Sequence, residues 1–351
     1  MSKTIVSGVS VFMALSARKK GGSGRLCSRV EWRVATLLTA LSVVFSIPSP
    51  TARAEWQDVI TGLRIGVVAA ENPQLAVQRL QPFADFLEAD LSVATEIVPF
   101  KSYTALIDAH ADRRVDIAAH SATSYLAARA ACGCIEAMAV PKSADGMTYF
   151  YGVAVTRRED RVTALADLNG RSVAFGAAGE TATNRVPSAH LAAEGRSPGR
   201  FFAKTQRFEN TGAAIGALMN REVDAVFTWS SLSGDLSGGY SRGPLRRLAA
   251  ADKLNMADLD IAWRSKPIPH GPVAIRADLP NEVRMTMRAL LLELHDRDPD
   301  AYAAMEQWHG RGFAPVEPAL FTDLAILLGY TEPDKEETAV TGTDDGSAEG
   351  D

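Results

Sequence analysis

The sequence predicts an α/β protein with two lobes, each a mostly parallel sheet flanked by helices. Segments typical of strands alternate with segments of helical periodicity from residue 63 onward, a pattern typical of βαβ units with parallel strands. The alternation breaks at a charged turn, residues 157–161, and then restarts. The body of residues 63–330 is long enough for two moderate lobes. We expect the first lobe to comprise residues 63–153 plus 267–330, and the second residues 156–262.

The predicted first lobe begins with an apolar strand at residues 63–69. Asn72 and Pro73 follow as an N-cap and a proline at the first helical position. Apolar residues at helical spacing then form one stripe, which consists of Leu80, Phe83, Leu87 and Leu91. A strand, a helix and a further strand follow, at residues 93–98, 103–111 and 115–119.

The predicted second lobe repeats this alternation after a crossing strand at residues 149–155. Its further strands are expected at residues 171–176, 201–208 and 224–228, and its helices from Thr181 and at residues 212–221. The segment 265–272, between strands at 261–264 and 273–276, is too rich in proline for the interior of a sheet. Three helices are expected to close the chain, at residues 281–295, 299–309 and 318–328.

Two helix starts directly follow strands, one in each lobe. In the second lobe the strand ending at residue 176 leads into a helix that can begin at Thr181 or Thr183, and in the first the strand ending at residue 119 leads into Ser124 and Tyr125. A helix start presents free N–H groups and the positive end of the helix dipole. Open parallel sheets bind ligands at the carboxyl ends of their strands. The sequence therefore predicts an anion-binding site in a cleft between the lobes.

Both ends of the chain are predicted to lie outside the fold. A basic lead, an apolar run at residues 34–47 and the small-x-small triplet ending at Ala54 are typical of a signal peptide, residues 1–54. We expect cleavage near Ala54 and a periplasmic mature protein. Residues 1–54 hold eight Lys/Arg and one acidic residue, so the net charge of −5 becomes about −12 after cleavage. Residues 331–351 hold eight acidic residues and predict a disordered tail.

Eight short segments follow one another in a specific order and spacing: LRIGVV at 63–68, VDIA at 115–118, the Ser124-Tyr125 pair, AVP at 139–141, LADLNGRSVAF at 165–175, Thr181 with Pro187, VDA at 223–225 and WRSKPIPHGPVAIRADLP at 263–280. In this order and spacing they resemble the phosphonate- and phosphate-type periplasmic substrate-binding proteins of ABC transporters, within the type II solute-binding fold. The resemblance covers most of residues 63–296.

The resemblance implies a two-lobed, type II periplasmic-binding-protein-like fold that closes on its ligand by hinge motion. It implies a small oxyanion ligand, phosphonate-, phosphite- or phosphate-like, and a membrane permease as partner. Matching positions make Tyr103, Ser124 and Tyr125 the ligand contacts of the first lobe, and Thr181 with its neighbour Thr183 those of the second. We expect a monomer without a cofactor.

Two further residues are candidates for the cleft. Tyr149 lies on a crossing strand, where it alternates with Tyr151, so that one face of the strand could line the cleft. Glu180 and Ala182 stand where relatives place hydroxyl residues. A carboxylate beside an anion site repels a dianion, so Glu180 in the cleft would favour an amine-bearing or neutral ligand. Outside the cleft, Glu180 is a partner for Arg185 or a solvated loop carboxylate.

Cys132-Gly133-Cys134 is an unusual feature with more than one interpretation. The two residues can be small thiols at a helix C-terminus with Gly133 as the turn residue, or they can pair in an oxidising compartment. Two thiolates at this spacing can also form a thiophilic site for trivalent arsenic or a soft metal. Some members of the family that the sequence resembles are arsenite sensors that use a cysteine and signal to a membrane histidine kinase. An arsenite sensor acting through Cys132 and Cys134 is therefore the alternative function.

Enzymatic and nucleic-acid functions are disfavoured by the sequence. It contains no G-x-S-x-G, no H-E-x-x-H and no phosphate-binding loop with its lysine, so we expect no catalytic residues. The mature chain is acidic, whereas a nucleic-acid partner requires a basic face.

Overall fold

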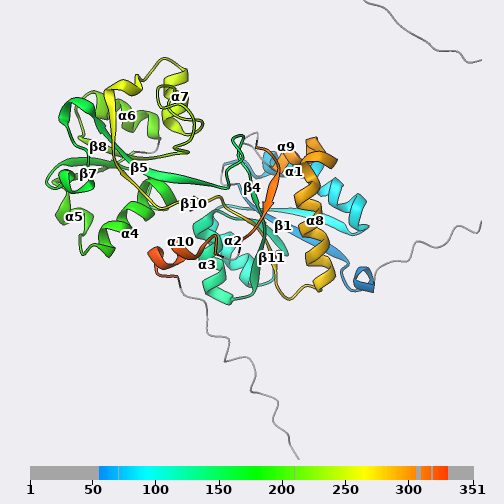
Figure 1. Cartoon of the computed structure of the whole chain (residues 1–351). Coiled ribbons are helices and arrows are strands. Elements are labelled where there is room, and N and C mark those ends of the chain that lie inside the picture. Colours follow the sequence, from blue (N-terminus) through cyan, green and yellow to red (C-terminus); the bar gives the residue numbers. More distant parts are fainter. Residues whose placement is uncertain (1–54, 70, 209, 306–309, 318, 331–351) are drawn as a thin grey trace, which may run out of the picture. The chain divides into compact units, whose positions relative to one another are not determined.

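The computed structural model describes residues 55–330, except 70, 209, 306–309 and 318 (Figure 1). The predicted signal peptide and the predicted acidic tail lie outside the described residues. No helix in the described part of the chain is both long and apolar enough to cross a membrane.

The first sheet has six strands in the order β12-β4-β11-β3-β1-β2. Both β2 and β3 pair parallel with β1, while β11 lies antiparallel between β3 and β4 and β12 pairs antiparallel with β4. Four strands therefore run in one direction, which confirms a mostly parallel sheet. The strands are β1 (Gly62–Val68), β2 (Ala94–Phe100), β3 (Ile117–Ala119), β4 (Ile135–Pro141), β11 (Val273–Arg276) and β12 (Phe313–Pro315).

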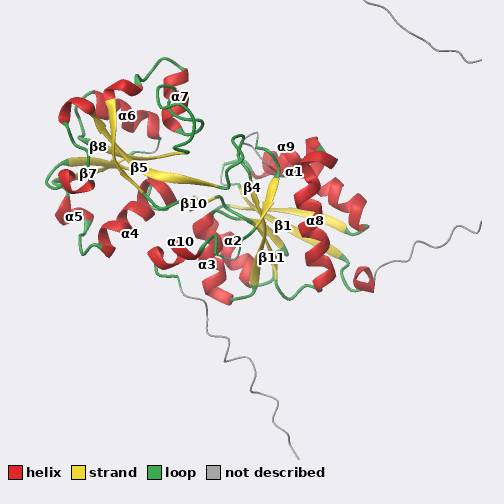
Figure 2. Cartoon of the chain, in the orientation of Figure 1, coloured by secondary structure: helices red, strands yellow, loops and turns green. Residues whose placement is uncertain are grey.

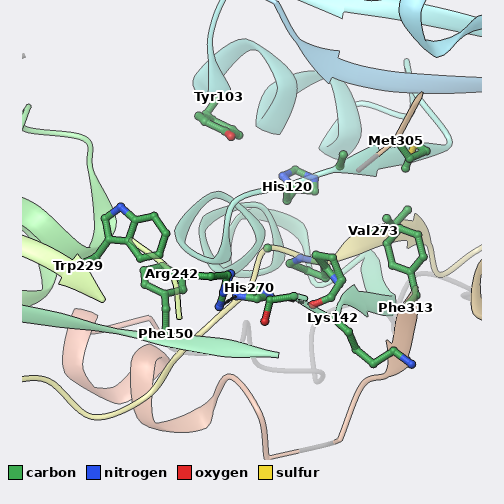
Figure 3. A pocket seen from close by; sticks show the side chains of 15 residues that line it. Tyr103, His120, Lys142, Phe150, Trp229, Arg242, His270, Val273, Met305 and Phe313 are labelled. Atoms are coloured by element: carbon green, nitrogen blue, oxygen red, sulfur yellow. Dashed lines mark hydrogen bonds between the residues drawn. The ribbon is translucent and has the colours of Figure 1, made fainter. Parts of the chain in front are cut away.

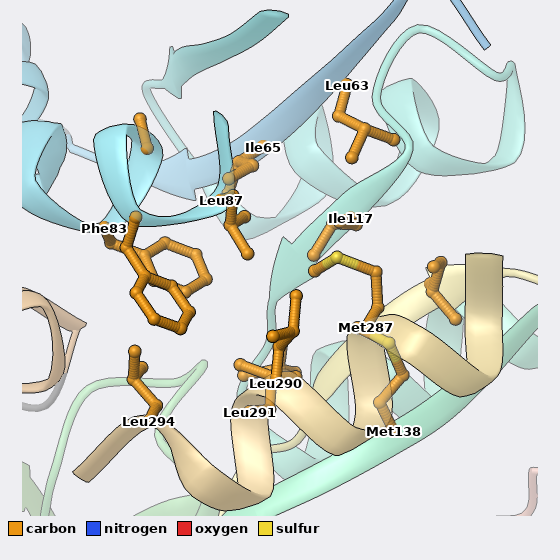
Figure 4. Close-up of a cluster of buried hydrophobic side chains, with 14 of the residues drawn as sticks. Leu63, Ile65, Phe83, Leu87, Ile117, Met138, Met287, Leu290, Leu291 and Leu294 are labelled. Atoms are coloured by element: carbon orange, nitrogen blue, oxygen red, sulfur yellow. The ribbon is translucent and has the colours of Figure 1, made fainter. Parts of the chain in front are cut away.

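Six helices accompany this sheet: α1 (Pro73–Leu91), α2 (Tyr103–Ala111), α3 (Ala122–Cys132), α8 (Asn281–Arg297), α9 (Pro299–Met305) and α10 (Thr322–Leu328). The Asn72 side chain accepts a hydrogen bond from the Leu75 N–H at 3.0 Å, which confirms the predicted N-cap of α1. Figure 4 shows the core that α1 and α8 form with the strands. Its labelled side chains are all buried: Leu63, Ile65, Phe83, Leu87, Ile117, Met138, Met287, Leu290, Leu291 and Leu294.

The second sheet has the order β10-β5-β8-β6-β7, and β9 also pairs with β5. Its strands are β5 (Tyr149–Arg157), β6 (Ser172–Phe175), β7 (Lys204–Arg207), β8 (Ala225–Ser230), β9 (Leu259–Arg264) and β10 (Ile268–Pro269). Only β5 runs against the other strands. Helices flank this sheet (Figure 2): a π-helical turn (Thr181–Arg185) that continues as α4 (Val186–Ala193), then α5 (Pro198–Phe201), α6 (Thr211–Met219) and α7 (Pro244–Ala250).

The two valine–aspartate pairs of the family-like segments have the same structural role in the two sheets. Asp116 accepts hydrogen bonds from the Arg64 N–H at 2.9 Å and from the Arg276 guanidinium at 2.8 Å. Asp224 accepts hydrogen bonds from the Ser172 N–H and hydroxyl, each at 2.8 Å. Each carboxylate therefore accepts a hydrogen bond from a backbone N–H group near the start of a neighbouring parallel strand. This structural role explains both aspartates without a ligand.

Some predicted elements differ from the structure. The expected strand at 201–208 is shorter, because Pro198 starts the short helix α5, which ends at Phe201, and β7 begins only at Lys204. Phe202 packs on Phe175 of β6 with ring centroids 5.9 Å apart, so this residue serves packing against the sheet. The expected helix at 318–328 begins later, at Thr322. Strands β4 and β12 and helix α7 were not predicted.

The chain crosses between the sheets at two connectors, residues 142–148 and 265–272. Within the second connector, β10 pairs antiparallel with Tyr149 and Phe150 of β5. The start of β5 and β10 therefore belong to the second sheet, although the predicted boundaries at 153 and 267 assign them to the first lobe. The exact lobe boundaries stay a proposal.

Gly271 lies where the second connector passes the first sheet. A Cβ atom at this position would stand 1.8 Å from the His120 carbonyl oxygen and 2.8 Å from its carbon, both of them backbone atoms. Because backbone cannot rotate away, we expect Gly271→Ala to lower the free energy of unfolding by about 1–3 kcal/mol, as overpacking does. Urea unfolding measures this change.

Gly199→Ala is the matched control for this prediction. A Cβ atom there meets nothing within 4 Å, and the residue lies in helix α5, where alanine is preferred to glycine. Equal stabilities of the two variants would show that the connector does not pack on His120.

Candidate ligand-binding site

A cavity of about 470 Å³ lies between residues of the two sheets and the two connectors (Figure 3). It is lined by Tyr103, Ala119, His120, Pro141, Lys142, Ser143, Phe150, Trp229, Arg242, His270, Gly271, Pro272, Val273, Met305 and Phe313. This volume is typical of sites for small organic molecules. The end of β3 and the start of α2 contribute to the lining, as expected for a site at the carboxyl end of a strand.

Arg242 is held by the first residue of β5 and by a histidine of the second connector. Its Nη2 donates to the Tyr149 carbonyl at 3.5 Å and to His270 Nε2 at 3.4 Å. The Nδ1 of His270 is 2.8 Å from the Pro141 carbonyl oxygen, which can only accept, so Nδ1 carries the proton and Nε2 is an acceptor. Burial lowers the pKa of His270 to about 4, so it is neutral at pH 7 and suited to orient the guanidinium.

Asp145 lies beside Arg242, with its Oδ1 3.7 Å from the arginine Nε. Its other oxygen accepts hydrogen bonds from the hydroxyls of Ser233 at 2.8 Å and Ser241 at 2.5 Å, and Ser143 donates to Oδ1. Burial alone would raise the pKa of Asp145, but these three hydroxyls and Arg242 hold it well below its usual range. The carboxylate therefore stays charged and connects the first connector to the segment that carries Arg242.

The charges around the cavity favour an anion. Arg242 and Lys142 are cations in the lining, and none of the described lining residues has a carboxylate. Asp145 balances one of the two positive charges, which leaves an excess of one. Guanidinium groups bind oxyanions with paired, directional N–H donors. The arrangement can therefore bind a small molecule with an anionic oxygen group.

A buried chain of hydrogen bonds leads from the cavity to the start of α3. His110 Nδ1 is 3.0 Å from His120 Nε2, and His120 Nδ1 is 3.2 Å from Ser124 Oγ. Because the Ser124 hydroxyl donates to the Ser121 carbonyl at 3.1 Å, it accepts from His120, and His120 in turn accepts from His110. Burial lowers the pKa of His110 to about 4 and that of His120, which also faces His110, to about 3. The chain requires a neutral His120, which accepts from His110, and burial keeps His110 neutral as well.

This histidine pair predicts a loss of stability in acid. A histidine whose pKa falls from 6.5 to about 4 on folding contributes fully above pH 6.5, and its contribution declines as the pH drops. Between pH 7.5 and pH 5 we expect the free energy of unfolding to fall by about 2 kcal/mol for each imidazole. Urea unfolding of the wild type and of His110→Gln/His120→Gln measures this: the double variant should lose less on acidification. Equal losses would contradict the role of the pair.

The structure brings the two predicted helix starts together. Thr123 Oγ1, in the first turn of α3, lies 3.1 Å from Thr181 Oγ1, the first residue of the π-helical turn. Tyr103 lines the cavity and is 45% exposed. Ser124 is buried in the histidine chain below it. Ligand contacts of Tyr103, Ser124 and Thr181 stay predictions.

Other predicted site residues lie away from the cavity lining. Tyr125 is 2% exposed and packs on Phe321, with ring centroids 4.9 Å apart. Glu180 is exposed and accepts a hydrogen bond from the Thr183 hydroxyl, so that both groups are engaged within one turn. The Tyr149 ring packs edge-on against Tyr151, and the Tyr149 carbonyl accepts a hydrogen bond from Arg242. Glu180 is not among the residues that line this cavity, and its contact with a ligand stays a prediction.

Of the interpretations of Cys132 and Cys134, the structure shows the paired form. The two residues form a disulfide, and in this form neither sulfur is a thiolate able to bind arsenic or a soft metal. Gly133 ends α3 in the left-handed conformation with φ 60°, as the turn interpretation expects. Among the described residues there is also no cluster of three or more His, Cys, Asp or Glu side chains able to hold a metal ion.

Sequence reasoning missed Arg242 and Lys142 as site residues. Lys142 directly follows the AVP segment of the family resemblance, and Arg242 lies next to the end of a loop rich in serine and glycine, residues 231–243. An arginine in such a loop, near a proline-rich crossing segment, is the available signal. It is weak, because loop residues have no periodicity that fixes their direction.

Comparisons with known proteins agree with this architecture. The family model described as "ABC transporter, phosphonate, periplasmic substrate-binding protein" matches residues 65–321. The phosphonates-binding periplasmic protein of Escherichia coli K12 is 22% identical over 293 residues, which cover 82% of this chain and 80% of that protein.

Solved structures show the same fold. XAC2383 from Xanthomonas citri, bound to ATP, has a TM-score of 0.60 at 17% identity, covering 77% of this chain and 97% of that one. PhnD1 from Prochlorococcus marinus, in complex with methylphosphonate, has a TM-score of 0.53 at 15% identity, covering 76% and 97%. With the two sheets, these likenesses confirm the expected type II fold. Because the family match spans most of its length, the chain belongs to the phosphonate periplasmic substrate-binding proteins of ABC transporters.

Proposed function

We propose that this protein binds a small phosphonate-like oxyanion in the Arg242 cavity, in the periplasm, and delivers it to a membrane permease. The observation that supports this best is the position of Arg242, which lines the cavity with Lys142 and without a lining carboxylate among the described residues. Relatives in this family are periplasmic components of transport systems rather than enzymes. A small-molecule ligand and a permease partner follow from family membership, and a monomeric state stays a prediction.

Closure on the ligand is proposed to use the two connectors as a hinge. Their paired segments, β10 and the start of β5, are short and extended, and such segments can absorb changes in φ and ψ during domain closure. Two contacts already join the lobes. Asp145 of the first connector accepts a hydrogen bond from Ser241, and Thr123 at the start of α3 contacts Thr181. A ligand on Arg242 would add to these contacts in the closed form and shift the population toward it.

Thermal unfolding and calorimetric titration test the proposed ligand class. Methylphosphonate, phosphite and phosphate are compared with methanesulfonate and acetate at equal concentration. A ligand at about 100 times its dissociation constant adds roughly 2.7 kcal/mol of stability. We expect at least one of the three phosphorus oxyanions to raise the unfolding midpoint more than acetate does. No stabilisation by any of the three would contradict the proposed function.

The alternative of an arsenite sensor is not proposed, because the two cysteines are joined in a disulfide.

A further inference from the structure

We propose that the preferred ligand carries an aromatic or similarly flat apolar group next to its oxyanion, as in an arylphosphonate or an aryl phosphate monoester. This inference rests on the proposed function, because it assigns the rest of the same cavity. It starts from the size of the cavity and from the aromatic and apolar side chains that line it.

The cavity has room for more than a minimal phosphonate. Its volume of about 470 Å³ lies within the range of sites for small organic molecules. Methylphosphonate has five non-hydrogen atoms, so a larger substituent could contact parts of the lining that methylphosphonate does not reach.

An aromatic wall lies beside Arg242. Phe150 and Trp229 meet edge to face with ring centroids 5.5 Å apart, and Phe150 also stacks on His270 at 5.8 Å with planes inclined by 26°. Both Phe150 and Trp229 line the cavity and are only partly buried. Figure 3 shows Trp229 and Phe150 on the same side of the cavity as the guanidinium. A flat ring attached to an oxyanion on Arg242 could therefore pack against them.

The remaining lining is also largely apolar. Val273, Met305 and Phe313 lie together on the other side of the cavity in Figure 3. Tyr103 lines the cavity as well and is 45% exposed, which is unusual for a large aromatic side chain and leaves ring surface free for a ligand. The two cations can bind the anionic group of the ligand, and these apolar surfaces can contact its apolar part.

Calorimetric titration of the mature protein with phenylphosphonate, phenyl phosphate and methylphosphonate tests the inference. Benzyl alcohol, which has the ring but no oxyanion, is the control. We expect phenylphosphonate or phenyl phosphate to bind at least about tenfold more tightly than methylphosphonate, since a well-filled apolar pocket discriminates by about this factor. The comparison of the two phenyl compounds separates the phosphonate from the phosphate ester.

The variant Trp229→Leu tests whether the aromatic wall causes the tighter binding of the phenyl compounds. It should weaken phenylphosphonate binding about tenfold and leave methylphosphonate within about twofold, while the circular dichroism spectrum stays that of the wild type. Tyr151→Leu is the matched control, because Tyr151 is a partly buried aromatic residue of β5 that does not line this cavity. It should leave both affinities unchanged.

The outcomes separate the two proposals. Equal affinity for methylphosphonate and both phenyl compounds would overturn the aromatic preference and leave the proposed function standing. Binding of none of the three would overturn the proposed function itself. An equal loss for methylphosphonate and phenylphosphonate in Trp229→Leu would assign Trp229 to the head group, against the inference.

Discussion

Replacing Arg242 by glutamine is expected to weaken phosphonate binding by about 100-fold. The guanidinium is oriented by the Tyr149 carbonyl and by the acceptor nitrogen of His270, and it lines the cavity, so it is positioned to donate to an oxyanion there. Hydrogen bonds between charged groups are about twice as strong as neutral ones. Truncating one partner of such a pair at a desolvated site costs about 2–5 kcal/mol, and 2.7 kcal/mol corresponds to about 100-fold.

Arg247→Gln is the control for this experiment, because it removes the same charge five residues further along the chain. Arg247 is exposed and does not line the cavity. The Arg247→Gln variant therefore tests only the long-range electrostatic effect of removing one positive charge, which salt screens. Calorimetric titration with methylphosphonate at about 0.15 M salt should show near-wild-type affinity for Arg247→Gln. Similar affinities for the two variants would remove Arg242 from the site.

The second large effect concerns stability. Arg157 is 4% exposed in the second lobe, and its Nη1 donates to the carbonyls of Leu218 at 2.5 Å and Val223 at 2.6 Å. Its Nη2 lies 2.6 Å from an oxygen of Asp160. Arg157→Met keeps the length of the side chain but leaves buried acceptors without their donor. Breaking a buried ion pair on one side costs about 3–5 kcal/mol, and we expect the free energy of unfolding to fall by this amount.

The adjacent residue supplies the control for Arg157→Met. The Arg158 side chain is 54% exposed and pairs with Asp260 at 3.2 Å, and exposed pairs contribute about 0–1 kcal/mol. Arg158→Met should therefore lower the free energy of unfolding by less than about 1 kcal/mol. Comparable urea midpoints for the two variants would show that the buried guanidinium does not organise the second lobe.

The elements of the fold were largely predictable because their signals are local. Asn72 caps α1 through a hydrogen bond that spans three residues, and the helix from Thr181 begins where the strand–turn pattern places it. The Glu180–Thr183 contact is equally local, yet its direction was not predictable, because the same carboxylate could face the cleft or its own turn. Tyr125 shows the same limit: it follows Ser124 directly, but the helical turn directs it toward Phe321.

The cation of the site could not be predicted from local signals. Arg242 reaches the cavity through its contacts with Tyr149 and Asp145, about a hundred residues earlier in the chain, and with His270. Neither periodicity nor capping encodes such contacts. They depend on the two connectors and on the loop after β8 meeting in the folded chain, and this meeting becomes visible only in the structure.

A crystal structure of the mature protein with methylphosphonate or phenylphosphonate tests the central claim most directly. The account predicts that a phosphonate oxygen lies about 2.7–3.0 Å from the Arg242 guanidinium, with the phenyl ring, where present, against Trp229. A ligand bound without Arg242, for example at the Thr181 helix start alone, would contradict it.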